Sequence, residues 1–447
     1  MTYEKGIPDY AMVLAKEIED NKIVPITKGA IYSPVQITNI AEKPKTTITL
    51  EEDILVPDTK PDLKEILMIN GKPHLTVRQI DSITKGEDSI NLSGEIDLQM
   101  LYVPEKAEKS LPVISVQSRV PFKDRWHTSM APGATVILDC NIEKIDYMVI
   151  NERKYRVKIV LSIMAKEYSD SKVDIFEGLI DEDLQSLKET IEISSVSMRK
   201  KDTLSISENI FPKDNSKPEA IIKQDLTIVE NYKQISTDKI VINGFVYVNL
   251  LYMSSSKEEI SSELPDDSKC SVDNLHQLQD RIEFTQFIPI SQSDGKRGCT
   301  VNFDDSQLRV KLIQDEEEKD AFRVEGEILT YIELYKNVEK EIIVDGYHRN
   351  KDFVCKFEEK VQSFVGTTSA EASSREIISP ENFEIDNIIY AAAEAETANS
   401  HCEQGKIITE GNIAVKMICS CSNEERQVFA VNESLPYRVA VTMPQLT

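Results

Sequence analysis

Four residues near the C-terminal end carry side chains that could bind a metal ion, namely His401, Cys402, Cys419 and Cys421. Zinc takes four nitrogen or sulfur ligands, usually from two short-spaced pairs such as C-x2-C. Here the close pair is C-x-C within an apolar stretch that is typical of a strand. We therefore interpret these thiols as core or strand-end side chains, and we expect no metal and no other cofactor.

Two carboxylates, Asp58 and Asp62, could serve as a general acid and base. However, they lie beside prolines that follow a predicted strand, and the acidic residues of a related later segment, Asp214 and Glu219, are placed differently. An Asp side chain caps a helix well, and proline suits the first helical turn because its missing N–H would have no partner there. We therefore predict a helix start at each segment, marked by Pro57, Asp58 and Pro61 in the first and by Pro212 and Pro218 in the second.

Other catalytic constellations are lacking in the sequence. His127 follows Trp126 with no Ser, Cys or acidic partner spaced to form a relay. None of the 15 glycines falls in a phosphate-binding G-x-G-x-x-G or G-x4-G-K-[ST] pattern. The acidic run from Asp315 to Asp320 lacks the spaced oxygen ligands of a calcium loop and suits a hairpin tip. We predict that the protein is not an enzyme.

Charge and composition exclude several partners. The 447 residues include 52 Lys and Arg against 77 Asp and Glu, which gives a net charge of −25. Such an acidic surface repels nucleic acid and anionic lipid. No apolar run reaches the ~20 residues of a membrane helix, and the N-terminus lacks the pattern of a signal peptide. We expect no membrane insertion and synthesis in the cytoplasm.

Short runs of alternating apolar and polar residues indicate a mainly β protein. Residues 90–100 and 157–163 show this period of two, whereas a helical spacing is seen at Leu63, Ile66 and Leu67. We predict strands throughout, with a few short helices.

A domain-sized repeat organises the chain. The run from Ile90 to Tyr102 recurs at residues 240–252 and 407–419, so that Gly94, Gly244 and Gly411 occupy one position, and Tyr102, Tyr252 and Cys419 another. An apolar–x–aromatic segment follows each copy, at residues 120–122, 282–284 and 435–437. A glycine inside a strand indicates a bulge, a bend or a close approach of two backbones.

We predict an N-terminal extension (residues 1–44) and three tandem β-sandwich-like repeats, each with a short helix, at residues 45–175, 190–340 and 341–447. A terminal hairpin closes the first two repeats, whereas the third ends soon after its 435–437 landmark and is expected to be incomplete. Exposed strand edges are association sites unless they are blunted. We therefore predict an interaction edge in repeat 3 at Ile413, Val415, Met417, Val428 and Tyr437.

The proline-rich segment at residues 56–62, the Gly94 strand and the 120–122 landmark resemble the SPOCS domain of Firmicute spore-coat proteins. The resemblance covers about residues 45–447 and is strongest in the first copy. It implies a role in sporulation and a coat-assembly partner, for which a SpoIVA-like ATPase is suspected. SipL-like members of this family usually end in a LysM module, which we expect this chain to lack, as either a truncated form or a paralogue.

The sequence thus favours a non-enzymatic scaffold of the spore coat, acting from the mother-cell cytoplasm at the forespore surface and later within the coat. Two alternatives stay open. The first is a self-assembling filament or spore-appendage subunit, in which residues 23–40 of one copy complete the third sheet of the next. The second is a glycan-binding module, against which the single tryptophan and 6% aromatic content argue.

Overall fold

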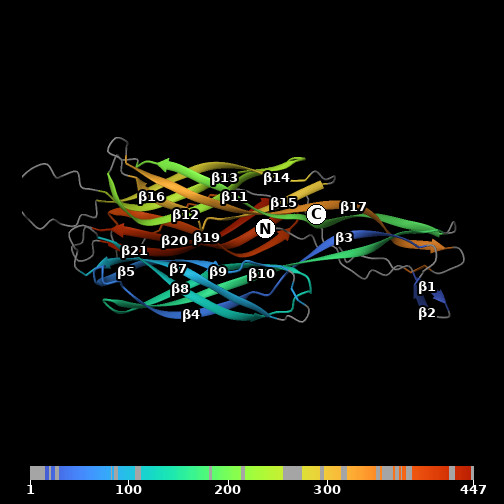
Figure 1. The fold of residues 1–447 in the computed structure, drawn as a ribbon, viewed down its shortest axis with the longest axis horizontal. Helices are drawn as coiled ribbons and strands as arrows, with labels where there is room; N and C mark the ends of the chain where they lie inside the picture. The colour runs from blue at the N-terminus through green and yellow to red at the C-terminus, as the bar shows by residue number, and fades with distance from the viewer. Residues whose placement is uncertain are drawn as a thin grey trace, which may run out of the picture.

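The computed structural model describes residues 16–19, 22–25, 30–81, 83–84, 89–105, 112–180, 184–212, 217–254, 274–291, 296–313, 320–348, 353–354, 366–367, 372–373, 375–378, 385–421 and 428–443 (Figure 1). These residues form strands β1 to β21 and contain no α-helix, and hence no helix able to span a membrane. The prediction of a mainly β protein is confirmed.

Three antiparallel sheets of three strands share one topology, with the middle strand in sequence also in the middle of the sheet. We call them inner sheets 1, 2 and 3. Their strands are β5 (Leu63–Leu75), β7 (Ser89–Pro104) and β8 (Ile114–His127); β12 (Pro218–Ile235), β13 (Lys239–Ser254) and β14 (Leu275–Pro289); and β19 (Asn387–Glu403), β20 (Lys406–Ser420) and β21 (Val428–Thr442).

The inner sheets close into a ring around one shared core. The last strand of each contacts the first strand of the next, β8 with β12, β14 with β19, and β21 with β5. Equivalent side chains from all three inner sheets meet in one buried cluster. It includes three sets of equivalent residues: Leu67, Ile222 and Ile389; Leu101, Leu251 and Ile418; and Val113, Leu275 and Val428. The chain is therefore a single-chain pseudo-trimer.

A second layer covers the outer face of the first two inner sheets. We call inner sheets 1 and 2 together with their covering strands sandwich 1 and sandwich 2. Over inner sheet 1 lie β4 (Thr46–Leu55), β10 (Lys154–Leu179), β9 (Thr135–Asn151) and the short β6 (Gln79–Ile80). Over inner sheet 2 lie β11 (Leu184–Ile210), β17 (Ala321–His348), β15 (Lys296–Asp304) and β16 (Arg309–Ile313). Within the described part of the chain, inner sheet 3 has no such covering sheet.

Three outer strands are long enough to run beyond the ring. β10, β11 and β17 have 26, 27 and 28 residues. They meet β3 (Ala30–Glu42) in a narrow extension with its own buried cluster, and β1 (Lys16–Glu19), β2 (Lys22–Pro25) and β18 (Phe353–Val354) lie toward its far end (Figure 1).

This extension does not favour the proposed role of the N-terminal segment in a filament. Strand β3 pairs along its length with residues 166–179 of β10 in the same chain. Val35 and Ile37 are buried in the cluster there. Since the segment is already paired and buried, it is not available to complete another copy's sheet.

The predicted short helices are wrong, and two β-bulges explain why. β5 shifts register against β7 between Leu63 and Glu65 and again between Ile66 and Met68. Each bulge adds one residue, so Leu63, Ile66 and Ile69 all face the sandwich core, while Leu67 faces the ring core. The resulting three- and four-residue spacing imitates a helical stripe.

Candidate interaction surfaces

The repeated glycines mark points where two strands and an aromatic ring come very close. A Cβ atom on Gly94 would lie 2.2 Å from the carbonyl oxygen of His74 and 2.6 Å from the Phe122 ring. Gly244 and Gly411 have the same surroundings, with Phe284 and Tyr437 as the paired aromatic residues. The glycine and the aromatic landmark are therefore one cross-strand pair, in which the ring covers the bare backbone.

The proline-rich segment forms a loop fixed by Arg153 rather than a helix cap. The Arg153 guanidinium donates to the carbonyl oxygens of Pro57 (3.1 Å) and Lys60 (2.7 Å), and it lies 3.1 Å from carboxylate oxygens of both Asp58 and Asp62. Pro61 precedes β5, and in the second repeat Pro218 begins β12, a position that proline tolerates. Pro212 lies just beyond β11. No motif or spacing in the sequence marks Arg153.

Tyr102 stabilises this loop through a hydrogen bond. Its ring is buried, and its hydroxyl donates to the Pro61 carbonyl at 2.6 Å. Burial raises the pKa of Tyr102 to about 12. The equivalent Tyr252 lies against His276 and Phe322, whereas the third repeat has the buried Cys419 at this position.

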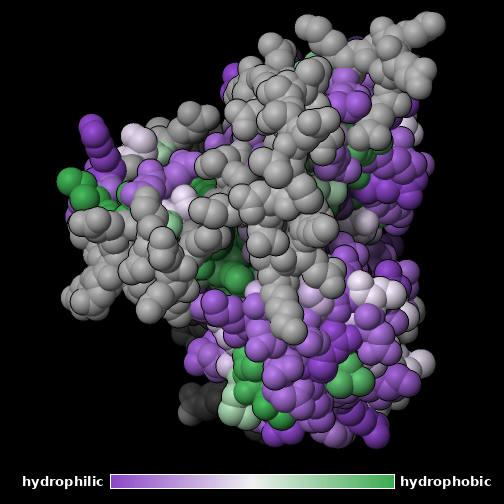
Figure 2. Space-filling model, turned by 90° about the vertical axis from the view of Figure 1, so that its left-hand side faces the viewer, coloured by the Kyte–Doolittle hydropathy of each residue, from purple (hydrophilic) through white to green (hydrophobic). Residues whose placement is uncertain are grey.

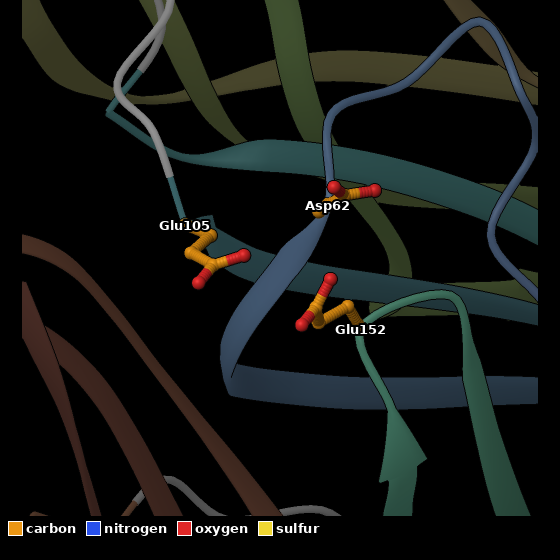
Figure 3. A group of neighbouring side chains, drawn as sticks. All are labelled: Asp62, Glu105 and Glu152. Carbon is orange, nitrogen blue, oxygen red and sulfur yellow. The ribbon is translucent and has the colours of Figure 1, made fainter.

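One acidic cluster surrounds the same loop. Figure 3 shows the carboxylates of Asp62, Glu105 and Glu152 converging from three connections at the end of sandwich 1. Their oxygens lie within 4.8 Å of one another, and all three residues are exposed. Because Asp62 already pairs with Arg153, we interpret the cluster as part of the loop closure.

The residues first considered as metal ligands are not brought together. Cys402 pairs with Ile407 at one end of β19 and β20, whereas Cys419 pairs with Ile388 at the other end. Cys419 is buried, and burial raises its thiol pKa. Trp126 belongs to the core of sandwich 1. The acidic run beginning at Asp315 lies almost entirely outside the described residues.

A cycle of polar contacts fixes the order of the inner sheets. The side chains at one equivalent position, Gln99, Asn249 and Lys416, each reach the next sheet of the ring. Gln99 donates to the Ile222 carbonyl (3.1 Å), Asn249 to the Ala391 carbonyl (3.1 Å), and Lys416 to the Asn70 side chain (3.0 Å).

A buried lysine side chain lies beside these contacts, and no pattern in the sequence marks it. Lys223 is 1% exposed and replaces the apolar Met68 of the first repeat. It pairs with Asp225, which also accepts from the Tyr390 hydroxyl, and burial lowers the pKa of Lys223. A buried ion pair adds little net stability, and we interpret this cluster as a polar contact that joins inner sheet 2 to inner sheet 3.

The outer face of inner sheet 3 differs from its two equivalents. The residue two positions after the repeated glycine is fully buried in the first repeats, where Ile96 and Val246 are each 0% exposed. The equivalent Ile413 is only half-buried, as are Val415 and Leu435 on the same face. Ile378 and Ile385 pack near one end of this face, against Met417 and Cys419. Figure 2, a view along the long axis, shows small hydrophobic patches among the hydrophilic residues at one end of the molecule.

The structure places the predicted interaction residues in several environments rather than along one strand edge. Ile413, Val415 and Met417 lie on β20, which is the central strand of its sheet. Val428, on the edge strand β21, points into the ring core. Tyr437, also on β21, covers Gly411. Only part of the predicted set can meet a partner, because strand order places the rest inside the sheet or the core.

Comparison with known families fits this architecture. The family model described as SipL, SPOCS domain matches residues 62–150 and 217–313. Each of these two segments is therefore a SPOCS domain. Each matched SPOCS segment begins at the first strand of an inner sheet and ends with β9 or β16, so β10 and β17 lie outside it. No curated protein and no solved structure matches the chain.

Proposed function

We propose that this SPOCS-domain protein is a non-enzymatic scaffold of the spore coat. It acts in the mother-cell cytoplasm at the forespore surface, later in the coat itself, and it docks to coat-assembly proteins through the surfaces of its β domains. Its two SPOCS domains support a role in sporulation and protein interaction. The suspected partner is a SpoIVA-like ATPase.

The structural observation that carries the docking role is the half-covered outer face of inner sheet 3. Ile413, Val415 and Leu435 present apolar side chains where the same positions of the first two repeats are shielded by a second sheet. Apolar surface of this kind gains free energy when a partner covers it. Neither the filament nor the glycan-binding alternative is favoured by a comparable observation.

A fluorescent fusion of the full chain, followed through sporulation, tests the proposal. We expect the wild-type fusion to gather at the forespore surface and the Val415→Glu variant to remain diffuse, because a buried carboxylate without a partner is costly at an interface. The matched control is Asn412→Glu, which adds the same charge to an exposed position on the opposite face of β20. A wild-type fusion that stays dispersed throughout sporulation would contradict the proposed function.

A further inference from the structure

Beyond the shared core, the ring faces of the three inner sheets differ in chemistry. The central strand of each sheet contributes a residue to the core seven positions after the repeated glycine, and alternate residues of a strand share one face. The residues one and three positions after the glycine therefore lie on the ring face as well. They are Glu95 and Asp97 in inner sheet 1, Asn412 and Ala414 in inner sheet 3, and Phe245 and Tyr247 in inner sheet 2.

The ring face of inner sheet 2 exposes aromatic and aliphatic side chains. Tyr247 is 43% exposed, and Val229, Tyr232 and Phe287 on the flanking strands are exposed at 42 to 60%. Val229 pairs with Phe245, whose ring lies 6.2 Å from that of Tyr247, and Tyr232 and Phe287 pair with β13 residues of the same face. Large apolar side chains that remain exposed on one face of a sheet are typical of a binding surface.

An arginine of this face shows how the second repeat departs from the first. Arg119 and Arg281 occupy equivalent positions, each opposite the third residue after the repeated glycine. The Arg119 guanidinium pairs with the carboxylates of Asp97 (2.9 Å) and Glu95 (4.0 Å). The Arg281 guanidinium instead lies over the Phe245 ring, 4.8 Å from its centre. The second repeat thus keeps the cation and replaces its two carboxylate partners with aromatic side chains.

Two cations of this face form no ion pair with another described residue. They are Arg281 and Lys239, whose ammonium group lies 5.4 Å from the centre of the Phe287 ring. Glu283, the acidic residue of β14 on the same face, accepts a hydrogen bond from the Asn243 side chain at 2.9 Å. A guanidinium stacked on a ring keeps its in-plane N–H donors, which match the geometry of a carboxylate. The face therefore combines apolar rings with two cations that can each receive a carboxylate.

We propose that the ring face of inner sheet 2 binds an extended acidic segment of a partner protein. One carboxylate of the segment pairs with Arg281, a second pairs with Lys239 beside Phe287, and apolar side chains between them cover Tyr247. Arg281 and Phe287 are about 20 Å apart along β14, so the two carboxylates are about six residues apart in an extended chain. The two cations disfavour a basic segment, and repulsion between two chains of net charge −25 disfavours a second copy. The inference rests on the proposed function and adds a docking surface for a partner of stated chemistry.

Site-specific photo-crosslinking of the full chain tests the inference. The photoreactive amino acid p-benzoylphenylalanine, which is itself aromatic, is placed at Tyr247, and sporulating cells that produce this chain are irradiated. Mass spectrometry should identify a crosslinked partner segment with carboxylates about six residues apart and apolar side chains between them. Arg281→Gln should lower the crosslink yield by about tenfold, because it removes a charge-assisted hydrogen bond. The matched control Arg119→Gln, at the equivalent position of inner sheet 1, should leave the yield unchanged, and circular dichroism checks that both variants fold.

The contrary results are equally specific. A crosslink to another part of the same chain would mean that the chain covers this face itself, and a crosslink to a second copy would mean that the chain associates with itself. A partner segment without acidic residues, a yield that Arg281→Gln leaves unchanged, or the absence of any crosslink would also overturn the inference. Forespore localisation without the crosslink removes only this inference, whereas the crosslink without localisation removes only the proposed function.

Discussion

Inner sheets 1 and 3 have the same strand order, the same glycine–aromatic pair and the same share of the ring core, yet among the described residues only inner sheet 1 has a second sheet over its outer face. Ile96 is fully buried between two sheets, whereas its equivalent Ile413 is half-buried. The apolar side chains on the ring face of each inner sheet are therefore buried by the neighbouring inner sheets. Burial of the opposite, outer face needs a second layer of strands.

The largest expected effect on stability comes from truncating the side chains of Ile96 and Ile413, which occupy equivalent positions. Ile96→Ala should lower the free energy of unfolding by about 3–4 kcal/mol, because it leaves a cavity between two packed sheets. Ile413→Ala should cost only about 1 kcal/mol, because solvent already reaches that side chain. Urea denaturation followed by circular dichroism measures both values. Equal losses would show that the third outer face is as well covered as the first.

A smaller difference is expected at the repeated glycines. Gly94→Ala should destabilise the protein by about 2–3 kcal/mol, because the new methyl group meets a backbone carbonyl and the Phe122 ring within a closed sandwich. Gly411→Ala should cost less, about 1–2 kcal/mol: the new methyl group also meets a backbone carbonyl, of Glu396, but the Tyr437 ring is only half-buried and can turn away, unlike the buried Phe122. Thermal unfolding of the two variants ranks them. A larger loss for Gly411→Ala would show that inner sheet 3 is the more rigid of the two.

The smallest effect concerns Tyr102, whose place Cys419 takes in the third repeat. Tyr102→Phe removes the hydrogen bond to Pro61 and should cost about 1 kcal/mol at neutral pH. Because the folded-state pKa is raised to about 12, the stabilisation due to the neutral phenol is complete below pH 10 and is lost between pH 10 and about 12. The stability of the variant should therefore fall less steeply in that window. Parallel slopes for the two proteins, measured by urea denaturation, would contradict this prediction.

Much of the inner-sheet architecture was predictable from short-range patterns. Period-two alternation identified β7 and β10, and the spacing of Gly94, Gly244 and Gly411 identified the repeat. The helices were predicted wrongly because bulges in β5 change the side-chain period locally, and no residue type marks a bulge. Arg153 and Lys223 were missed because the loop and the ion pair that they serve exist only after distant segments have come together.

Sequence alone established three copies of one β unit. The evidence was strand periodicity and a recurring glycine followed by an aromatic landmark, and both depend on residues that are near in the chain or aligned by simple pairing. The closed ring, the polar contacts within it and the half-buried outer face of inner sheet 3 depend on which strand borders which. That choice follows from burying apolar faces of segments more than a hundred residues apart, and no local pattern encodes it.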